Sequence, residues 1–224
     1  MTTQLAALAI TSAVTVALVA VARPYRGKPT WGPITHTALT AWSFALPFLV
    51  PSALGLPALT AMSALRAALV GIALYALTLA LTLGFPRFSR RSSTFIILAR
   101  HATTAPLRTF VVMTVVAPVL EEYVFRGFLF DVFARWGIIS AVVATSLLFV
   151  ISHRDRAGAA LFAIAGVAFA LLRINGDGVA LPIIAHAVAN VCAFTTFVQL
   201  KRVAPWLVDQ PAESGSRAVA PEST

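Results

Sequence analysis

Acidic side chains are scarce in this chain of 224 residues, which has eight Asp and Glu against 17 Lys and Arg. No carboxylate side chain occurs before Glu121. The single cysteine, Cys192, lies in an apolar run, and an intramolecular disulfide is therefore excluded. The sequence also contains no Gly-rich phosphate loop, no HExxH motif and no Cys/His cluster of zinc-finger spacing. These absences leave no sequence signature of a nucleotide-binding, disulfide-stabilised or zinc-finger protein.

The composition is typical of a membrane protein. Apolar residues make up 59% of the chain, charged residues make up 11%, and the mean hydropathy is +0.87. The formal net charge of +9 is carried by arginines that lie between apolar runs and form no continuous basic face. We therefore interpret this charge as setting the membrane topology, and we predict no nucleic-acid partner.

Several apolar runs are long enough to cross a lipid bilayer, since a spanning helix needs about 20 mostly apolar residues. The sequence therefore predicts an all-α, polytopic transmembrane helix bundle of about seven spans within residues 1–203. Residues 204–224 are rich in Pro, Ser, Glu and Ala, and we expect them to form a disordered polar tail. The candidate spans are 4–22, 34–54, 66–84, 106–130, 137–153, 158–173 and 179–200.

The basic residues predict how these spans are oriented. The first run, 4–22, lacks the positive start of a signal peptide and is followed by three basic residues within 23–28, so we expect a retained span. The segment 85–105 is rich in arginine, whereas 55–65 contains neither Lys nor Arg. This alternation predicts a multi-pass protein of the cell membrane with its N-terminus outside and its C-terminus in the cytoplasm.

The first two carboxylates lie inside a predicted span, where ionisable side chains are costly and usually face a partner in the bundle interior. Glu122 and Arg126 are four residues apart in the favourable order for an ion pair, so we expect them to be structural partners. Glu121 is rotated by about 100° from Glu122. We expect it to point into a cavity beside a helix kink at Pro118. The alternative is that these charges only hold helices together and that the helix is simply curved.

Two further polar positions lie in later spans. His153, four residues after Phe149, ends the span 137–153, and His186 shares a helix face with Asn190. An interfacial histidine and an interhelical hydrogen bond are the simpler interpretations. Together with the first glutamate, however, these residues supply a carboxylate, two imidazoles and a carboxamide. Such a set can activate water and stabilise an oxyanion, which the hydrolysis of an amide requires.

Three motifs in the chain resemble those of the CAAX prenyl protease type II and bacteriocin-processing (CPBP, or Abi) intramembrane protease family. They are EExxxR at 121–126, FxxxH at 149–153, and Hxxx followed by Asn at 186–190. The resemblance covers about residues 107–195. It implies a helical, membrane-embedded endopeptidase that acts on a peptide or protein substrate near the membrane.

The resemblance also implies a role for each motif residue. Glu121 and His153 would activate a water molecule, and His186 and Asn190 would stabilise the tetrahedral oxyanion. The remaining motif residues, Glu122, Arg126 and Phe149, would support these four.

Some family members are described as metalloproteases. In that case Glu121, His153 and His186 would bind zinc. The sequence leaves zinc binding and direct water activation equally open, because a neutral imidazole serves either purpose.

The predicted topology places the two histidines far apart. His153 comes out near the cytoplasmic end of its span, and His186 nearer the opposite side. For the two to meet, their helices must be tilted, broken or differently bounded from the predicted spans.

Two non-enzymatic classes remain open on the sequence alone. One is an immunity or scaffold protein that keeps the fold without turnover, although such a protein would be expected to lose motif residues and none is missing. The other is a proton-coupled carrier that uses the glutamate and the histidines as a relay. Carriers often show inverted halves with paired broken helices, and the sequence shows no such symmetry. The substrate is equally open, and bacteriocin maturation, self-immunity and peptide-signal processing are family-level alternatives.

Overall fold

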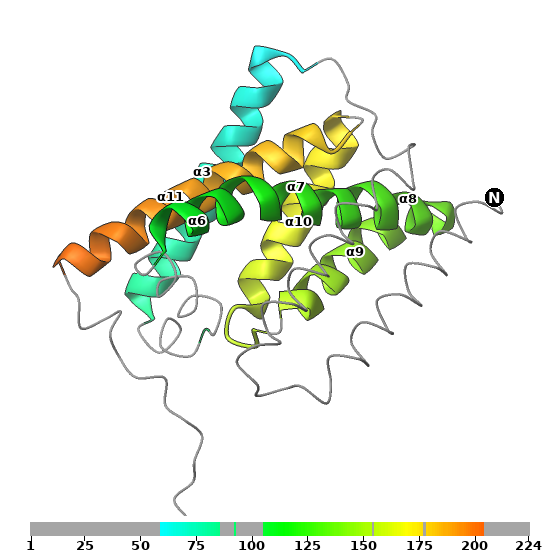
Figure 1. Cartoon of the computed structure of the whole chain (residues 1–224). Coiled ribbons are helices and arrows are strands. Elements are labelled where there is room, and N and C mark those ends of the chain that lie inside the picture. The colour runs from blue at the N-terminus through cyan, green and yellow to red at the C-terminus, as the bar shows by residue number, and fades with distance from the viewer. Residues whose placement is uncertain (1–58, 86–91, 93–104, 154, 177, 204–224) are drawn as a thin grey trace, which may run out of the picture.

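The computed structural model describes residues 59–85, 92, 105–153, 155–176 and 178–203. Residues 200–203 are described by their backbone alone. All regular structure in these ranges is helical, which confirms the predicted all-α class (Figure 1). The predicted spans 4–22 and 34–54 and the tail 204–224 lie outside the described residues. The span count of seven therefore stays a prediction.

Three of the described helices are long and apolar enough to cross a membrane. A fourth apolar helix, α9, is shorter, with 16 residues. These four helices correspond to the predicted spans 66–84, 137–153, 158–173 and 179–200. Their observed bounds are Ala61–Gly84 for α3, Ile138–His153 for α9, Ala159–Gly176 for α10 and Ala180–Val203 for α11.

Helix α3 begins earlier than predicted because its N-terminus is capped. The backbone N–H of Ser63 donates to the Thr60 hydroxyl, and the backbone N–H of Thr60 donates to the Ser63 hydroxyl, each over 3.1 Å. This reciprocal pair satisfies two N–H groups that have no partner within the helix. The cap therefore sets the first residue of α3 at Ala61.

The segment predicted as one span, 106–130, is continuous but unevenly wound, and it is irregular on both sides of Pro118, where the sequence predicted a kink. Two π-helical stretches interrupt it, and the second follows directly after Glu122. In the first stretch the N–H of Ala117 bonds to the carbonyl of Val112, five residues back. This wider turn comes just before Pro118, whose ring would collide with the carbonyl four residues back in a regular α-helix. The elements are α6 Pro106–Val111, η3 Val112–Val116, α7 Ala117–Glu122, η4 Tyr123–Leu129, α8 Phe130–Phe133 and η5 Ala134–Trp136.

Close contact between helices depends on two glycines. Helix α3 crosses α11, and at Gly71 a Cβ atom would lie 2.3 Å from the backbone oxygen of Ala185 (Figure 1). Helix α10 packs along α9, and at Gly166 a Cβ atom would lie 3.0 Å from the Cα of Ser146. A larger residue at either position would push the helices apart.

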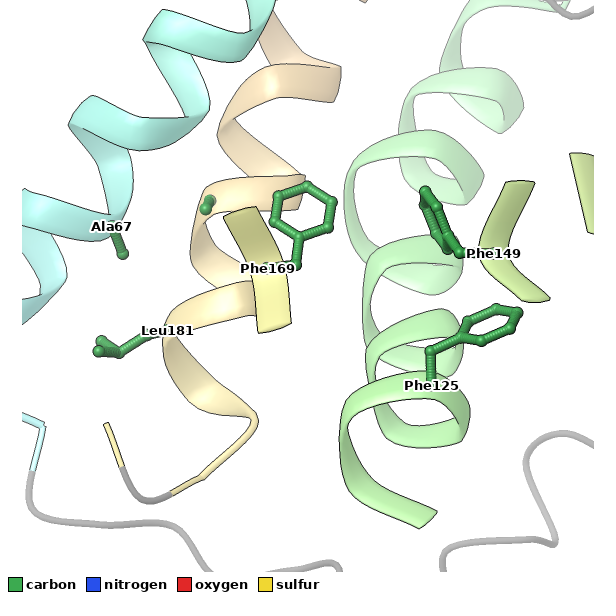
Figure 2. Close-up of a cluster of buried hydrophobic side chains, with 6 residues drawn as sticks. Ala67, Phe125, Phe149, Phe169 and Leu181 are labelled. Carbon is green, nitrogen blue, oxygen red and sulfur yellow. The ribbon is translucent and has the colours of Figure 1, made fainter. Parts of the chain in front are cut away.

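The core gathers side chains from five elements of the bundle. Phe149 of α9 is 1% exposed, and Phe169 of α10 is 2% exposed. In the view of Figure 2, Phe169 lies between the α11 and η4 segments, Phe149 lies beside Phe125 on the other side of η4, and Ala67 of α3 lies on the far side of α11. The cluster comprises Ala67, Phe125, Phe149, Phe169, Leu181 and Ala185. It packs α10 against η4, α9 and α11, the three elements of the cluster that carry motif residues.

Candidate active site

A fully buried ion pair lies at the centre of the site. Glu122 and Arg126 are both 0% exposed, and Arg126 Nη1 lies 3.2 Å from Glu122 Oε2. The pairing predicted from their spacing is therefore present. A buried charge that loses its partner is strongly destabilising, so each of these residues depends on the other.

Arg126 is held by aromatic rings and by helix α10 as well. Its guanidinium carbon lies 4.6 Å from the ring centre of Phe149 and 5.3 Å from that of Phe169. Its Nη2 donates to the backbone carbonyl of Gly166 over 3.0 Å. Its own backbone carbonyl accepts from Arg173 Nε, also over 3.0 Å. Cation–π contacts are strongest where water is absent, so this surrounding offsets part of the cost of burying the charge.

Glu122 makes a second contact that the sequence did not predict. Its Oε1 lies 2.9 Å from His186 Nδ1, a contact that joins α7 to α11. An ionised carboxylate can only accept, so with Glu122 ionised the Nδ1 of His186 carries a proton. Glu122 is thereby shared between Arg126 and His186, and Nε2 of His186 is left to face the site.

His153 is oriented by its own helix. Its Nδ1 lies 2.8 Å from the backbone carbonyl of Phe149, one turn earlier. A carbonyl can only accept, so Nδ1 is the donor and Nε2 faces outward from this contact. In both histidines Nδ1 is therefore bound to an oxygen, and Nε2 is the nitrogen that meets the site.

Glu121 is the residue on which the two histidines converge. Its Oε2 lies 4.0 Å from His153 Nε2 and 3.9 Å from His186 Nε2. The side chain is 32% exposed, but this oxygen is buried and has no hydrogen-bond partner among the described residues. The structure thus brings together three of the four residues to which the family pattern gives a catalytic role.

The large separation of the histidines expected from the predicted topology is not observed. His153 stacks on Phe162, near the start of α10, and His186 stacks on Phe169, further along the same helix. Seven residues of α-helix rise about 10 Å, which is far less than the thickness of a bilayer. The histidines meet for two reasons. Helix α9 ends at His153, and α10 begins six residues later at Ala159 and packs back along α9. His186 lies in the second turn of α11.

Asn190, the fourth residue, has a different partner. Its Nδ2 donates to the backbone carbonyl of Met113 in η3 over 2.7 Å. Within the described part of the chain, no hydrogen bond or ion pair joins it to Glu121 or to either histidine. The second N–H of the carboxamide is not used by this contact. Asn190 thus ties α11 to the π-helical stretch that precedes Glu121.

Helix α10 carries no motif residue, yet it lines the site. Phe162, Gly166 and Phe169 contact His153, Arg126 and His186, respectively. Their i, i+4, i+7 spacing places them on one helix face and is visible in the sequence. The signal is weak because almost every residue of this span is apolar, so nothing distinguishes the buried face from the faces that meet lipid.

The donor set matches the chemistry of a zinc site only in part. A carboxylate and two imidazoles are suitable ligands, and both histidines have the Nδ1–oxygen contact typical of metal ligands. Two ligands of one tetrahedral zinc, each at about 2.0–2.1 Å, lie roughly 3.4 Å apart. The observed glutamate–histidine separations of 3.9 and 4.0 Å are longer. No group of three His, Cys, Asp or Glu among the described residues has the spacing for a metal ion. The residues as placed do not fit zinc.

The described residues thus form an all-helical bundle, with helices apolar enough to cross a membrane, in which a glutamate and two histidines meet. Comparison with known proteins finds similarity to membrane peptidases. Residues 103–192 match the family model described as type II CAAX prenyl endopeptidase Rce1-like. The matched segment contains all three motifs and confirms the family resemblance.

Two curated relatives are similar to this chain. The first is the putative membrane peptidase YdiL of Bacillus subtilis (strain 168), 30% identical over 104 residues, which are 46% of this chain and 42% of YdiL. The second is the membrane-embedded CAAX protease MroQ of Staphylococcus aureus (strain USA300), 33% identical over 124 residues, which are 52% of this chain and 48% of MroQ. The chain thus spans somewhat less than half the length of these relatives. No solved structure matches it.

Proposed function

We propose that this protein is an intramembrane endopeptidase that hydrolyses a peptide bond with a water molecule activated by Glu121 and His153. One observation carries the proposal. Nε2 atoms from two separate helices lie 4.0 and 3.9 Å from the same carboxylate oxygen of Glu121. Polar groups separated by more than about 3.5 Å are often bridged by water. The three side chains therefore surround a position suited to a reacting oxygen.

Glu121 and His153 act as the base. Each can accept a hydrogen bond from the water, because Nε2 of His153 keeps its lone pair while Nδ1 donates to the Phe149 carbonyl. As the water oxygen attacks the substrate carbonyl carbon, one proton passes to the Glu121 carboxylate. That proton is then delivered to the leaving nitrogen, the C–N bond breaks, and a carboxylic acid and an amine are released.

His186 and Asn190 stabilise the oxyanion. To donate from Nε2 while Nδ1 donates to Glu122, the His186 ring must be doubly protonated. The 2.9 Å contact with the Glu122 carboxylate supports that form, since hydrogen bonds between opposite charges are the stronger ones. The different Nδ1 partners, a carbonyl for His153 and a carboxylate for His186, thus suit one ring to accept a proton and the other to donate one.

The substrate is a peptide or protein at the membrane. The family description and the name of MroQ point to peptides that end in a CAAX sequence, with or without a prenyl group. Leader peptides are the second class to test.

The experiment uses the purified full chain in liposomes with quenched fluorescent peptides of three kinds: farnesylated CAAX, unmodified CAAX and leader-type. We expect the wild type to cleave at least one of these peptides and Glu121→Gln to cleave none, because glutamine keeps the shape of the side chain but is not a base. Asp131→Asn is the matched control, because it neutralises a carboxylate that pairs with Arg173. Full cleavage by Glu121→Gln would rule out the mechanism, and no cleavage of any peptide by the wild type would favour a non-catalytic membrane protein.

A further inference from the structure

We propose that helix α10 positions both histidines of the site, with Phe162 orienting the ring of His153 and Phe169 orienting the ring of His186. The inference rests on the proposed peptidase function for its catalytic consequence, but its structural part can be tested without turnover. It adds to the site a helix that contains none of the three motifs.

Each histidine has one phenylalanine ring stacked on its face, and Phe149 meets both histidines at a steeper angle, 57° for His153 and 79° for His186. The centres of the His153 and Phe162 rings are 4.0 Å apart with an angle of 26° between the planes. The centres of the His186 and Phe169 rings are 5.0 Å apart with an angle of 17°. Both arrangements are stacked, and both phenylalanines come from the same face of α10.

The Nδ1 contacts alone do not fix the ring planes. The terminal torsion of histidine has broad minima, so a ring anchored at one nitrogen can still tilt about that contact. A stacked ring opposes this tilt, because tilting would lose the face-to-face contact. One hydrogen bond and one stacked ring together define where Nε2 points, and in both histidines it points to Glu121 Oε2.

The distance from α10 to the site is set by Gly166, which lies between the two phenylalanines in the chain. Gly166 allows α10 to approach α9 closely, since a Cβ atom there would lie 3.0 Å from both Cα and Cβ of Ser146. The carbonyl of Gly166 also accepts from Arg126 Nη2. Gly166 therefore docks α10 against α9 and against the buried ion pair, with one stacking ring on either side of the docking point.

The structural test uses the full chain in detergent micelles, labelled with carbon-13 at histidine Cε1. A proton held over the face of a phenyl ring is shifted upfield by the ring current. We expect the His153 signal to move downfield in Phe162→Leu and to stay in place in Phe162→Tyr, with the His186 signal unchanged. Phe169→Leu and Phe169→Tyr should act on the His186 signal in the same way. If neither histidine signal moves in its leucine variant, the proposal is overturned, whether or not the protein cleaves any peptide.

The kinetic test uses the cleavage assay with whichever of the three peptides the wild type hydrolyses. We expect kcat to fall about 10- to 100-fold in each leucine variant with KM nearly unchanged, because misplacing a catalytic group slows the chemical step. The tyrosine variants should recover most of the rate. Phe133→Leu is the matched control, since Phe133 packs on Phe130, Ala141 and Ala170 and away from the histidines. Leucine variants that keep the wild-type kcat would refute the positioning role. A wild type that cleaves none of the peptides would count against the proposed function, and the histidine signals would still decide whether the rings are held by α10.

Discussion

His186 and Glu122, 64 positions apart in the chain, are joined by a 2.9 Å contact between Nδ1 and Oε1. Arg126 Nη1 donates a hydrogen bond to the same Oε1 over 3.3 Å and lies 3.2 Å from the other oxygen, Oε2. Glu122 thus links a histidine of the proposed oxyanion site to a buried cation that α10 also binds. We propose that the adjacent glutamates divide their tasks, with Glu122 organising the interior and Glu121 facing the substrate.

Replacing each glutamate by glutamine should separate these tasks. Glu122→Gln removes the charge opposite Arg126 and should lower the free energy of unfolding by about 3 kcal/mol, the scale of a broken buried pair. Glu121→Gln should abolish cleavage but leave thermal unfolding in detergent close to that of the wild type. Equal loss of stability in both variants would contradict the division.

Removing the Asn190 side chain should affect both stability and rate. Asn190→Ala loses the interhelical hydrogen bond to the Met113 carbonyl, worth about 1 kcal/mol in a membrane protein. If the second N–H serves the oxyanion, kcat should fall by about 100-fold or more, the scale of a lost oxyanion donor. A loss of stability with an unchanged kcat would limit Asn190 to a structural role.

The crossing of α3 over α11 should tolerate no side chain at Gly71. Gly71→Ala would bring a Cβ atom within 2.3 Å of the Ala185 carbonyl, directly before His186, so both stability and cleavage should fall. Gly84→Ala is a control on the same helix, because nothing lies within 4 Å of a Cβ atom at that position. The melting temperatures and cleavage rates of the two variants provide the measurement. Similar values for both would show that the crossing is looser than the structure has it.

Cleavage should survive chelation. The glutamate–histidine separations of 3.9 and 4.0 Å suit a bridging water better than a shared zinc ion, so incubation with a chelator should leave the rate within about twofold of its starting value. If the chelator abolishes cleavage and added zinc restores it, Glu121, His153 and His186 are instead assigned as zinc ligands.

Sequence and structure agree where the relevant contact is local. The Glu122–Arg126 pair follows from a four-residue spacing on one helix, and the motif order anticipates the meeting of Glu121 with two histidines. The Glu122–His186 contact could not be predicted, because it depends on how α11 packs against α7. The π-helical winding was missed for a similar reason: an apolar span shows no polar face whose period would reveal a wider turn.

The π-helical stretch Tyr123–Leu129 gives this segment a tolerance of chain length that a regular helix lacks. A π turn holds one residue more than the α turn it replaces. Deleting one residue after Arg126 within the stretch would therefore restore a regular turn and leave α8 on nearly the same face of the helix. A deletion in a regular α turn is not absorbed in this way and rotates everything that follows by about 100° about the helix axis. A deletion between Glu122 and Arg126 would also change the four-residue spacing of the buried ion pair.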